Sequence, residues 1–153
     1  MDLILWRHAD AEDHRPGLGD LDRRLTAKGR KQARRMATWL GERIPADARI
    51  LVSPALRAQE TADALDRTYQ VLPDIAPDAS AQHLLSAAGW PHGHGTILLV
   101  GHQPTLGEAA ALALSGRVLE WPIRKGAIWW LSAQGGTTTL RAVIDTKLMD
   151  GEP

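Results

Sequence analysis

Three short runs of consecutive apolar residues are the clearest pattern along the chain. They cover residues 3–6, 50–52 and 97–100, and each leads directly into polar or turn-forming residues. A continuous apolar run of this length is typical of a strand that is buried on both faces of a parallel sheet. The pattern therefore predicts three buried strands of such a sheet.

The segments between and after these runs have apolar residues at helical spacing. Residues 26–44 predict an amphipathic helix with Thr26 as its N-cap and a basic outer face; its apolar positions are Ala33, Met36, Ala37, Leu40 and Ile44. Ser53 predicts the N-cap of a second helix, because Pro54 then occupies the first helical position, where its missing N–H costs nothing. The predicted inner face of this second helix includes Leu56, Ala64 and Leu65. The alanine-rich residues 105–114 predict a third helix that Gly116 closes.

The last part of the chain predicts two more strands. Residues 128–131 and 138–144 are rich in strand-forming residues, and Gly135-Gly136 between them favours a hairpin. Alternating strands and helices imply a largely parallel sheet that helices cover on both faces. We therefore expect an α/β fold over residues 1–153, a single three-layer α/β/α domain with a mostly parallel central sheet.

Composition excludes several classes of protein. A chain of 153 residues is long enough for one domain with a sizeable core. Its 18 basic and 18 acidic residues give no net charge, which argues against a general nucleic-acid binder. The absence of cysteine excludes disulfides, thiolate metal sites and cysteine nucleophiles. We see no signal-peptide pattern and no apolar run approaching the ~20 residues of a membrane span, so we expect a cytoplasmic protein without membrane contact.

Candidate chemistry follows the ends of the three apolar runs. The first run leads into Arg7 and His8, the second into a segment that contains Arg57, and the third into Gly101 and His102. In open α/β sheets, ligands bind beyond the carboxyl ends of the strands. We therefore expect two arginines and two histidines at one edge of the sheet.

This set of side chains favours a phosphate group as the ligand. Two guanidiniums facing one small site repel each other unless an anion lies between them, and their planar donors suit phosphate. His8 is the candidate nucleophile, since a neutral imidazole offers a free lone pair and the nearby Arg7 and Arg57 disfavour its protonation. We expect a backbone carbonyl to hold one ring N–H of His8, and His102 to donate to a phosphoryl oxygen.

Simpler interpretations remain open for each of these residues. Any of the four could be a solvent-facing strand end, turn or helix residue. A second basic set is predicted to be a solvated helix face rather than a nucleic-acid patch; it comprises Arg23, Arg24, Lys28, Arg30, Lys31, Arg34 and Arg35. His92 and His94 could hold a metal together with His102, but a surface loop is the better interpretation because no paired carboxylate accompanies them.

At these residues the chain resembles the histidine phosphatase superfamily (phosphoglycerate mutase-like), and within it the SixA-like phosphohistidine phosphatases. Residues 6–10 (WRHAD) resemble the opening Arg-His-Gly motif, and residues 25–33 (LTAKGRKQA) the L-T-x-x-G-x-x-Q-A element. Residues 52–62 (VSPALRAQETA) match the S-P-x-x-R-A-x-x-T-A element, and residues 100–104 (VGHQP) the second-histidine motif. The resemblance covers about two-thirds of the chain and keeps the family's motif order.

The resemblance implies a metal-independent and cofactor-free phosphatase. It assigns His8 as a nucleophile that carries a covalent phosphoryl group, and Arg7, Arg57 and His102 as the phosphate pocket. Its implied partners are a phosphohistidine-carrying protein or a small phosphorylated metabolite. The oligomeric state, and any contact of His14 or Gln103 with the ligand, stay open.

Two departures from the family pattern bear on the substrate. Ala9 replaces the motif glycine, and its methyl group restricts the backbone and could crowd the pocket. No general acid can be assigned, and Asp74 and Asp78 are candidates only by location. Because imidazole leaves phosphorus with less help from an acid than an alcohol does, we favour phosphohistidine on a protein as substrate. A small-molecule phosphomonoesterase or mutase, and a non-catalytic phosphate-recognition module, are the alternatives.

Overall fold

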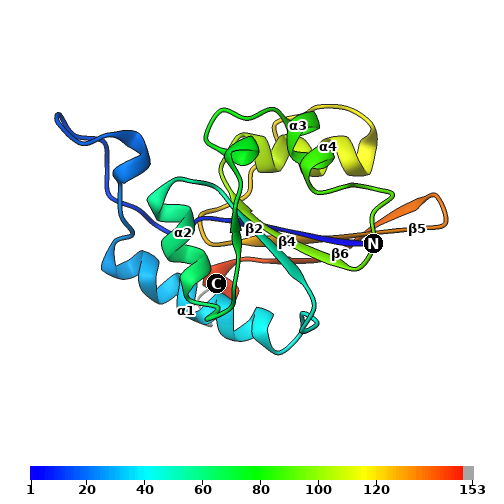
Figure 1. Ribbon diagram of the computed structural model, residues 1–153, viewed down its shortest axis with the longest axis horizontal. Coiled ribbons are helices and arrows are strands. Elements are labelled where there is room, and N and C mark those ends of the chain that lie inside the picture. Colours follow the sequence, from blue (N-terminus) through cyan, green and yellow to red (C-terminus); the bar gives the residue numbers. More distant parts are fainter. Residues whose placement is uncertain (150–153) are drawn as a thin grey trace.

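The computed structural model describes residues 1–149, which fold around one six-stranded sheet (Figure 1). The strands are β1 (Asp2–Arg7), β2 (Arg49–Val52), β3 (Gln70–Val71), β4 (Thr96–Gly101), β5 (Ile128–Gln134) and β6 (Thr137–Ile144). Their order is β3-β2-β4-β1-β5-β6. The first four are parallel, whereas β5 runs antiparallel to β1 and β6 antiparallel to β5. The predicted mostly parallel sheet is confirmed.

Helices cover both faces of the sheet. Figure 1 shows α1 (Ala27–Gly41) and α2 (Leu56–Asp63) on one side, and α3 (Ala81–Ala87) and α4 (Thr105–Ser115) on the other. Three short helices complete the described chain: η1 (Asp20–Asp22), η2 (Pro73–Ile75) and α5 (Thr146–Met149). The α/β fold with its three layers is therefore as predicted. None of the helices over residues 1–149 is long and apolar enough to cross a lipid bilayer.

The strands supply two cores because successive side chains point to opposite faces. On β1, Leu3 and Leu5 pack with α3 and α4, while Ile4 and Trp6 pack with α1 and α2. All four are fully buried. This is the arrangement that the continuous apolar runs predict, since both faces of each such strand lie beneath helices.

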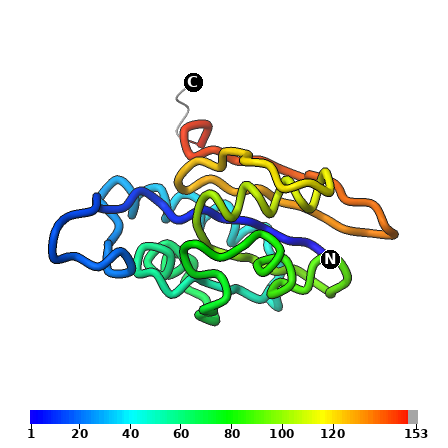
Figure 2. Tube along the Cα trace, turned by 90° about the horizontal axis from the view of Figure 1, so that it is seen from above, coloured from blue at the N-terminus to red at the C-terminus, as the bar shows by residue number. Residues whose placement is uncertain are grey.

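Most of the predicted element ends are close to the observed ones. The Thr26 hydroxyl accepts a hydrogen bond from the N–H of Gly29 and caps α1, and Gly116 closes α4 with a φ of 75°. The hairpin forms through Gly135 and Gly136, which both have positive φ. Figure 2 shows its tip at one end of the molecule and the loop before α1 at the opposite end.

The start of α2 differs from the prediction. Ser53 is not its N-cap: Ala55 holds that position without a side-chain bond, and the helix begins at Leu56. The Ser53 hydroxyl is engaged elsewhere, because it accepts the N–H of Ala55 at 3.2 Å and contacts a histidine. The buried face of α2 also differs, since it carries Arg57, Ala58, Thr61 and Ala62 rather than Leu56.

Candidate active site

The parallel register of β1 and β4 brings the two predicted histidines together. Arg7 and Gly101, the last residues of these strands, lie side by side, and the N–H of His8 donates to the Gly101 carbonyl at 3.1 Å. His8 and His102 follow them directly, and their ring centroids are 5.2 Å apart. The two imidazoles meet because neighbouring parallel strands end at the same level.

All four predicted residues line one pocket of about 390 Å³: Arg7, His8, Arg57 and His102. Both histidines and Arg57 are almost fully buried, with 6%, 5% and 3% of their surfaces exposed. The solvent-facing interpretation of these three side chains is therefore wrong. A larger pocket of about 510 Å³ lies elsewhere, around Trp39 and Trp130, and contains none of the four.

A backbone carbonyl fixes the state of the His8 ring. Its Nδ1 lies 2.8 Å from the Ala9 oxygen, and since a carbonyl can only accept, Nδ1 must carry the proton. Nε2 is then a free lone pair. Burial, followed by the charges of Arg57, Arg7 and Arg23, lowers the pKa of His8 to about 3, against the opposing effect of the Ala9 carbonyl. The ring is neutral at physiological pH.

His102 is neutral for similar reasons. Burial is the main cause that lowers its pKa to about 3, and His8 and Arg57 add to it. Its Nε2 lies 2.7 Å from the Ser53 hydroxyl, while its Nδ1 is buried without a partner.

The two arginines are anchored by backbone oxygens. Arg7 Nη1 donates to the carbonyl of Ile123 at 2.9 Å, and Arg57 Nη1 donates to the carbonyl of Asp20 at 2.7 Å. Burial lowers the pKa of each, and each also feels a neighbouring guanidinium, but arginine stays charged in proteins. Arg7 and Arg57 therefore each contribute a fixed positive charge to the pocket.

Three buried nitrogens of this pocket's side chains have no hydrogen-bond partner. They are Nε of Arg7, Nε of Arg57 and Nδ1 of His102, and no other buried side-chain N or O atom within residues 1–149 is unpaired. Buried polar groups without a partner are rare and commonly mark the place of a missing ligand or water. A tetrahedral oxyanion would supply acceptors to this cationic set.

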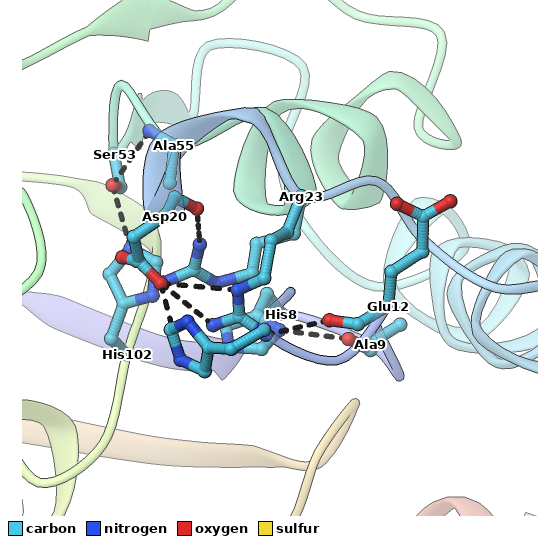
Figure 3. Close-up of polar contacts among 10 residues, drawn as sticks. His8, Ala9, Glu12, Asp20, Arg23, Ser53, Ala55 and His102 are labelled. Carbon is cyan, nitrogen blue, oxygen red and sulfur yellow. Dashed lines mark hydrogen bonds and ion pairs between the residues drawn. The ribbon is translucent and has the colours of Figure 1, made fainter. Parts of the chain in front are cut away.

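Sequence reasoning missed Asp20 and Arg23, which also line the pocket. Arg23 was predicted as part of a solvated helix face, but it precedes α1 and its side chain is only 15% exposed. Its Nη1 donates to the Glu12 carbonyl at 2.8 Å and its Nε to Asp20 at 3.1 Å. Figure 3 shows the Asp20 carboxylate turned toward Arg23 beside the histidines. No apolar run leads into this loop, so the pattern that found the other residues carries no signal here.

Asp20 joins two of the guanidiniums. Its carboxylate accepts from Arg57 Nη2 at 3.2 Å as well as from Arg23. Burial alone would raise the pKa of Asp20, but the charge of Arg57 and the hydrogen bonds from Arg23 and Arg57 outweigh it and lower that pKa. Asp20 is therefore ionised and holds no proton to donate.

The structure separates the two acids that were candidates by location. Asp78 lines the pocket, but Asp74 does not and instead lies 3.4 Å from His83. His14 and Gln103, which the sequence left open, both line the pocket. The alternative metal site does not form, since no group of three or more potential ligands comes together within the described residues.

Ala9 fits where the family motif has glycine. It is fully buried beside Ala11, Leu25 and Ala33, and it is not among the residues that line the pocket. Its N–H donates to Thr61 Oγ1 at 3.0 Å, and the same hydroxyl donates to the Arg57 carbonyl at 2.7 Å. The expected crowding is absent, and Thr61 ties the segment after His8 to α2.

Comparison with known proteins agrees with this geometry. Residues 3–79 match the family model of the histidine phosphatase superfamily (branch 1). Phosphohistidine phosphatase SixA of Escherichia coli (strain K12) is 32% identical over 120 residues, which cover 72% of this chain and 73% of that protein. The chain therefore belongs to the histidine phosphatase superfamily. Within the superfamily it is SixA-like, as its motifs predicted.

Solved structures show the same fold. The protein histidine phosphatase SixA complexed with tungstate has a TM-score of 0.83 at 26% identity and covers 97% of this chain and 99% of its own. A putative alpha-ribazole-5'-P phosphatase from Escherichia coli has a TM-score of 0.74 at 21% identity, covering 95% and 98%. The fold is thus shared by proteins named for different phosphorylated substrates.

Proposed function

We propose that this chain is a phosphohydrolase that forms a covalent phosphohistidine on His8 and acts on phosphohistidine carried by a protein. The state of the His8 ring carries the proposal. Its Nδ1 is held by the Ala9 carbonyl, which leaves the Nε2 lone pair free in a pocket that Arg7 and Arg57 also line. A neutral, oriented nucleophile beside fixed positive charge is what attack on a phosphoryl group requires.

The proposed reaction has two steps. His8 Nε2 attacks phosphorus, the bond from phosphorus to the leaving group breaks, and the leaving group departs with the electron pair. Water then attacks the phosphoryl group on His8, which releases inorganic phosphate and restores the imidazole. Arg7, Arg57 and His102 would bind the phosphoryl oxygens in both steps, so the scheme assigns no role to a metal or other cofactor. The tungstate in the SixA structure supports an oxyanion as the occupant.

The carboxylates of the pocket support phosphohistidine as the substrate. Asp20 is ionised between Arg57 and Arg23, while Asp13 and Asp78 are exposed side chains rather than buried neighbours of His8. An alcohol leaving group needs a positioned acid, which contributes about 10²–10⁴-fold. An imidazole protonated on its other nitrogen leaves as a neutral base and needs far less help.

Two alternatives stay in competition. A small-molecule phosphomonoesterase or mutase would use the same pocket, and fold alone does not distinguish substrates. A mutase must keep its phosphoryl group from water, and the exposed Asp13, His14 and Asp78 among the lining residues argue against so closed a site. A non-catalytic phosphate-binding module would need the arginines but not a fixed His8 tautomer.

The test compares turnover on two classes of substrate. We expect a clear preference in kcat/KM for a protein phosphorylated on histidine over sugar phosphates and an aryl phosphate such as p-nitrophenyl phosphate. A preference for the monoesters would contradict the protein substrate while leaving the phosphatase chemistry intact. Binding of the phosphoprotein without release of phosphate would instead support the recognition module.

A further inference from the structure

Ser53 lies directly against the second histidine although the reaction scheme gives it no role. It follows β2, whose register with β4 pairs Val52 with Val100, so Ser53 comes level with Gly101, the residue before His102. Ser53 is fully buried, and its hydroxyl oxygen lies 2.7 Å from Nε2 of His102. Figure 3 shows this contact on the His102 ring.

The hydrogen bonds of Ser53 decide which atom donates. A serine hydroxyl has one proton and two acceptor sites. Its oxygen accepts the N–H of Ala55 at 3.2 Å, and the contact with His102 Nε2 is its other hydrogen bond within the described residues. With the ring proton on Nε2, both the hydroxyl proton and the Nδ1 lone pair would be buried without a partner, whereas donation by the hydroxyl to Nε2 leaves only Nδ1–H unpaired. Nε2 must then be unprotonated, and the ring proton resides on Nδ1.

We propose that Ser53 is a positioning residue that donates to Nε2 of His102 and thereby keeps Nδ1–H available to a phosphoryl oxygen. Nδ1 is the one ring nitrogen of His102 that Ser53 leaves free, and it is buried without a partner. If Nε2 instead donated to the Ser53 oxygen, the Ser53 proton would have no acceptor. Nδ1 would then offer an anion a lone pair instead of an N–H. The role of Nδ1–H rests on the proposed function, but the tautomer does not.

The backbone around Ser53 holds the hydroxyl in this direction. Its own N–H donates to the Val100 carbonyl at 3.1 Å, which extends the β2–β4 ladder by one residue. Pro54 has no N–H to offer, so the first free donor after Ser53 is that of Ala55, which the hydroxyl accepts. This local bond explains why Ser53 is not the N-cap of α2: its oxygen is fixed between Ala55 and His102.

The first test reads the tautomer of His102 without any substrate. In nitrogen-15 NMR spectra at neutral pH, with the His102 signals identified by their loss in His102→Asn, we expect a protonated Nδ1 and an unprotonated Nε2. Ser53→Ala should yield a mixture of tautomers. Addition of inorganic phosphate should shift the Nδ1–H signal of the native protein. A native spectrum with the proton on Nε2 would overturn the proposal, whether or not the protein is a phosphatase.

The second test measures turnover of the phosphorylated substrate. Ser53→Ala should lower kcat by about 10–100-fold, the range found when a partner that orients a metal-binding histidine is removed, with a smaller change in KM. Ser132→Ala is the matched control, because that hydroxyl bonds Asp2 at the other end of β1, and it should leave turnover unchanged. Folded Ser53→Ala protein with native turnover would contradict the positioning role. If Ser53→Ala does not fold, the native NMR spectrum still decides the tautomer.

Discussion

At the scale of single residues, the site depends on keeping imidazoles neutral among guanidiniums. Burial lowers the pKa of both His8 and His102 to about 3. Both rings are therefore neutral at physiological pH, and the positive charge offered to an anion comes from the arginines. The Ala9 carbonyl holds one nitrogen of His8 and leaves the other free, which is the state that the proposed nucleophile requires. In the proposed reaction, the arginines supply positive charge, His8 supplies the lone pair and His102 a neutral donor.

The lowered pKa values predict a pH dependence of stability. In the unfolded chain a histidine has a pKa of ~6.5, whereas in the folded protein that of His8 is about 3. Between these values the unfolded state binds protons that the folded state does not, so the free energy of unfolding falls as the pH falls from about 6.5 toward 3. The stability that the folded protein gains from keeping these rings neutral is fully present above pH ~6.5.

Urea unfolding at a series of pH values checks this prediction. Above pH ~5 most carboxylates do not titrate, so we expect His8→Asn to flatten the slope of stability between pH 6.5 and 5. His94→Asn, which changes an exposed histidine, should keep the native slope. Equal slopes in all three proteins would show that His8 is not held neutral by the fold.

At the scale of elements, one glycine lets α1 pack against the segment that follows His8. A Cβ on Gly29 would lie 1.9 Å from the Asp10 carbonyl oxygen, which is far inside van der Waals contact. From the next turn of α1, Gln32 accepts the Asp10 N–H at 3.0 Å. The glycine and glutamine of the L-T-x-x-G-x-x-Q-A element thus both serve to dock α1 on Asp10.

Gly29→Ala is therefore expected to destabilise the protein. Overpacking of this kind costs about 1–3 kcal/mol, which exceeds the ~1 kcal/mol gain in helix propensity. Gly41, the last residue of the same helix, has no atom within 4 Å of its Cβ position, so Gly41→Ala should leave stability unchanged or raise it by up to ~1 kcal/mol. Urea unfolding measures both. If Gly29→Ala is as stable as Gly41→Ala, the close packing against Asp10 is refuted.

The elements also show what the sequence can and cannot predict. Arg7 ends a buried strand, and His8 and His102 each follow one directly, so the rule for strand ends predicts their position. The helix signals at Thr26 and Gly116 are local. Asp20 and Arg23 lie in the segment between β1 and α1, whose path depends on tertiary contacts with Arg57 and Glu12. Ser53 has the sequence pattern of an N-cap, but its hydroxyl is hydrogen-bonded to His102, which lies 49 positions away in the sequence.

At the scale of the whole molecule, the order of the strands creates the site. β1, β2 and β4 are adjacent and parallel, so the segments after them converge although they lie far apart in sequence. Figure 1 shows these three strands within the central sheet, between the two helical layers. The two layers bury the strands, and polar chemistry is confined to the residues beyond the strand ends. Because proteins named for different phosphorylated substrates share this fold, the fold alone does not identify the substrate.

If the phosphoryl group passes through His8, the phosphohistidine intermediate can be trapped on that residue. The protein is mixed with a labelled phosphoryl donor, quenched rapidly in alkali and mapped by mass spectrometry. We expect label on His8 that is stable to alkali and lost in acid, no label on His8→Ala, and native labelling of His94→Ala. Label on another residue, or undiminished turnover by His8→Ala, would contradict phosphoryl transfer through His8.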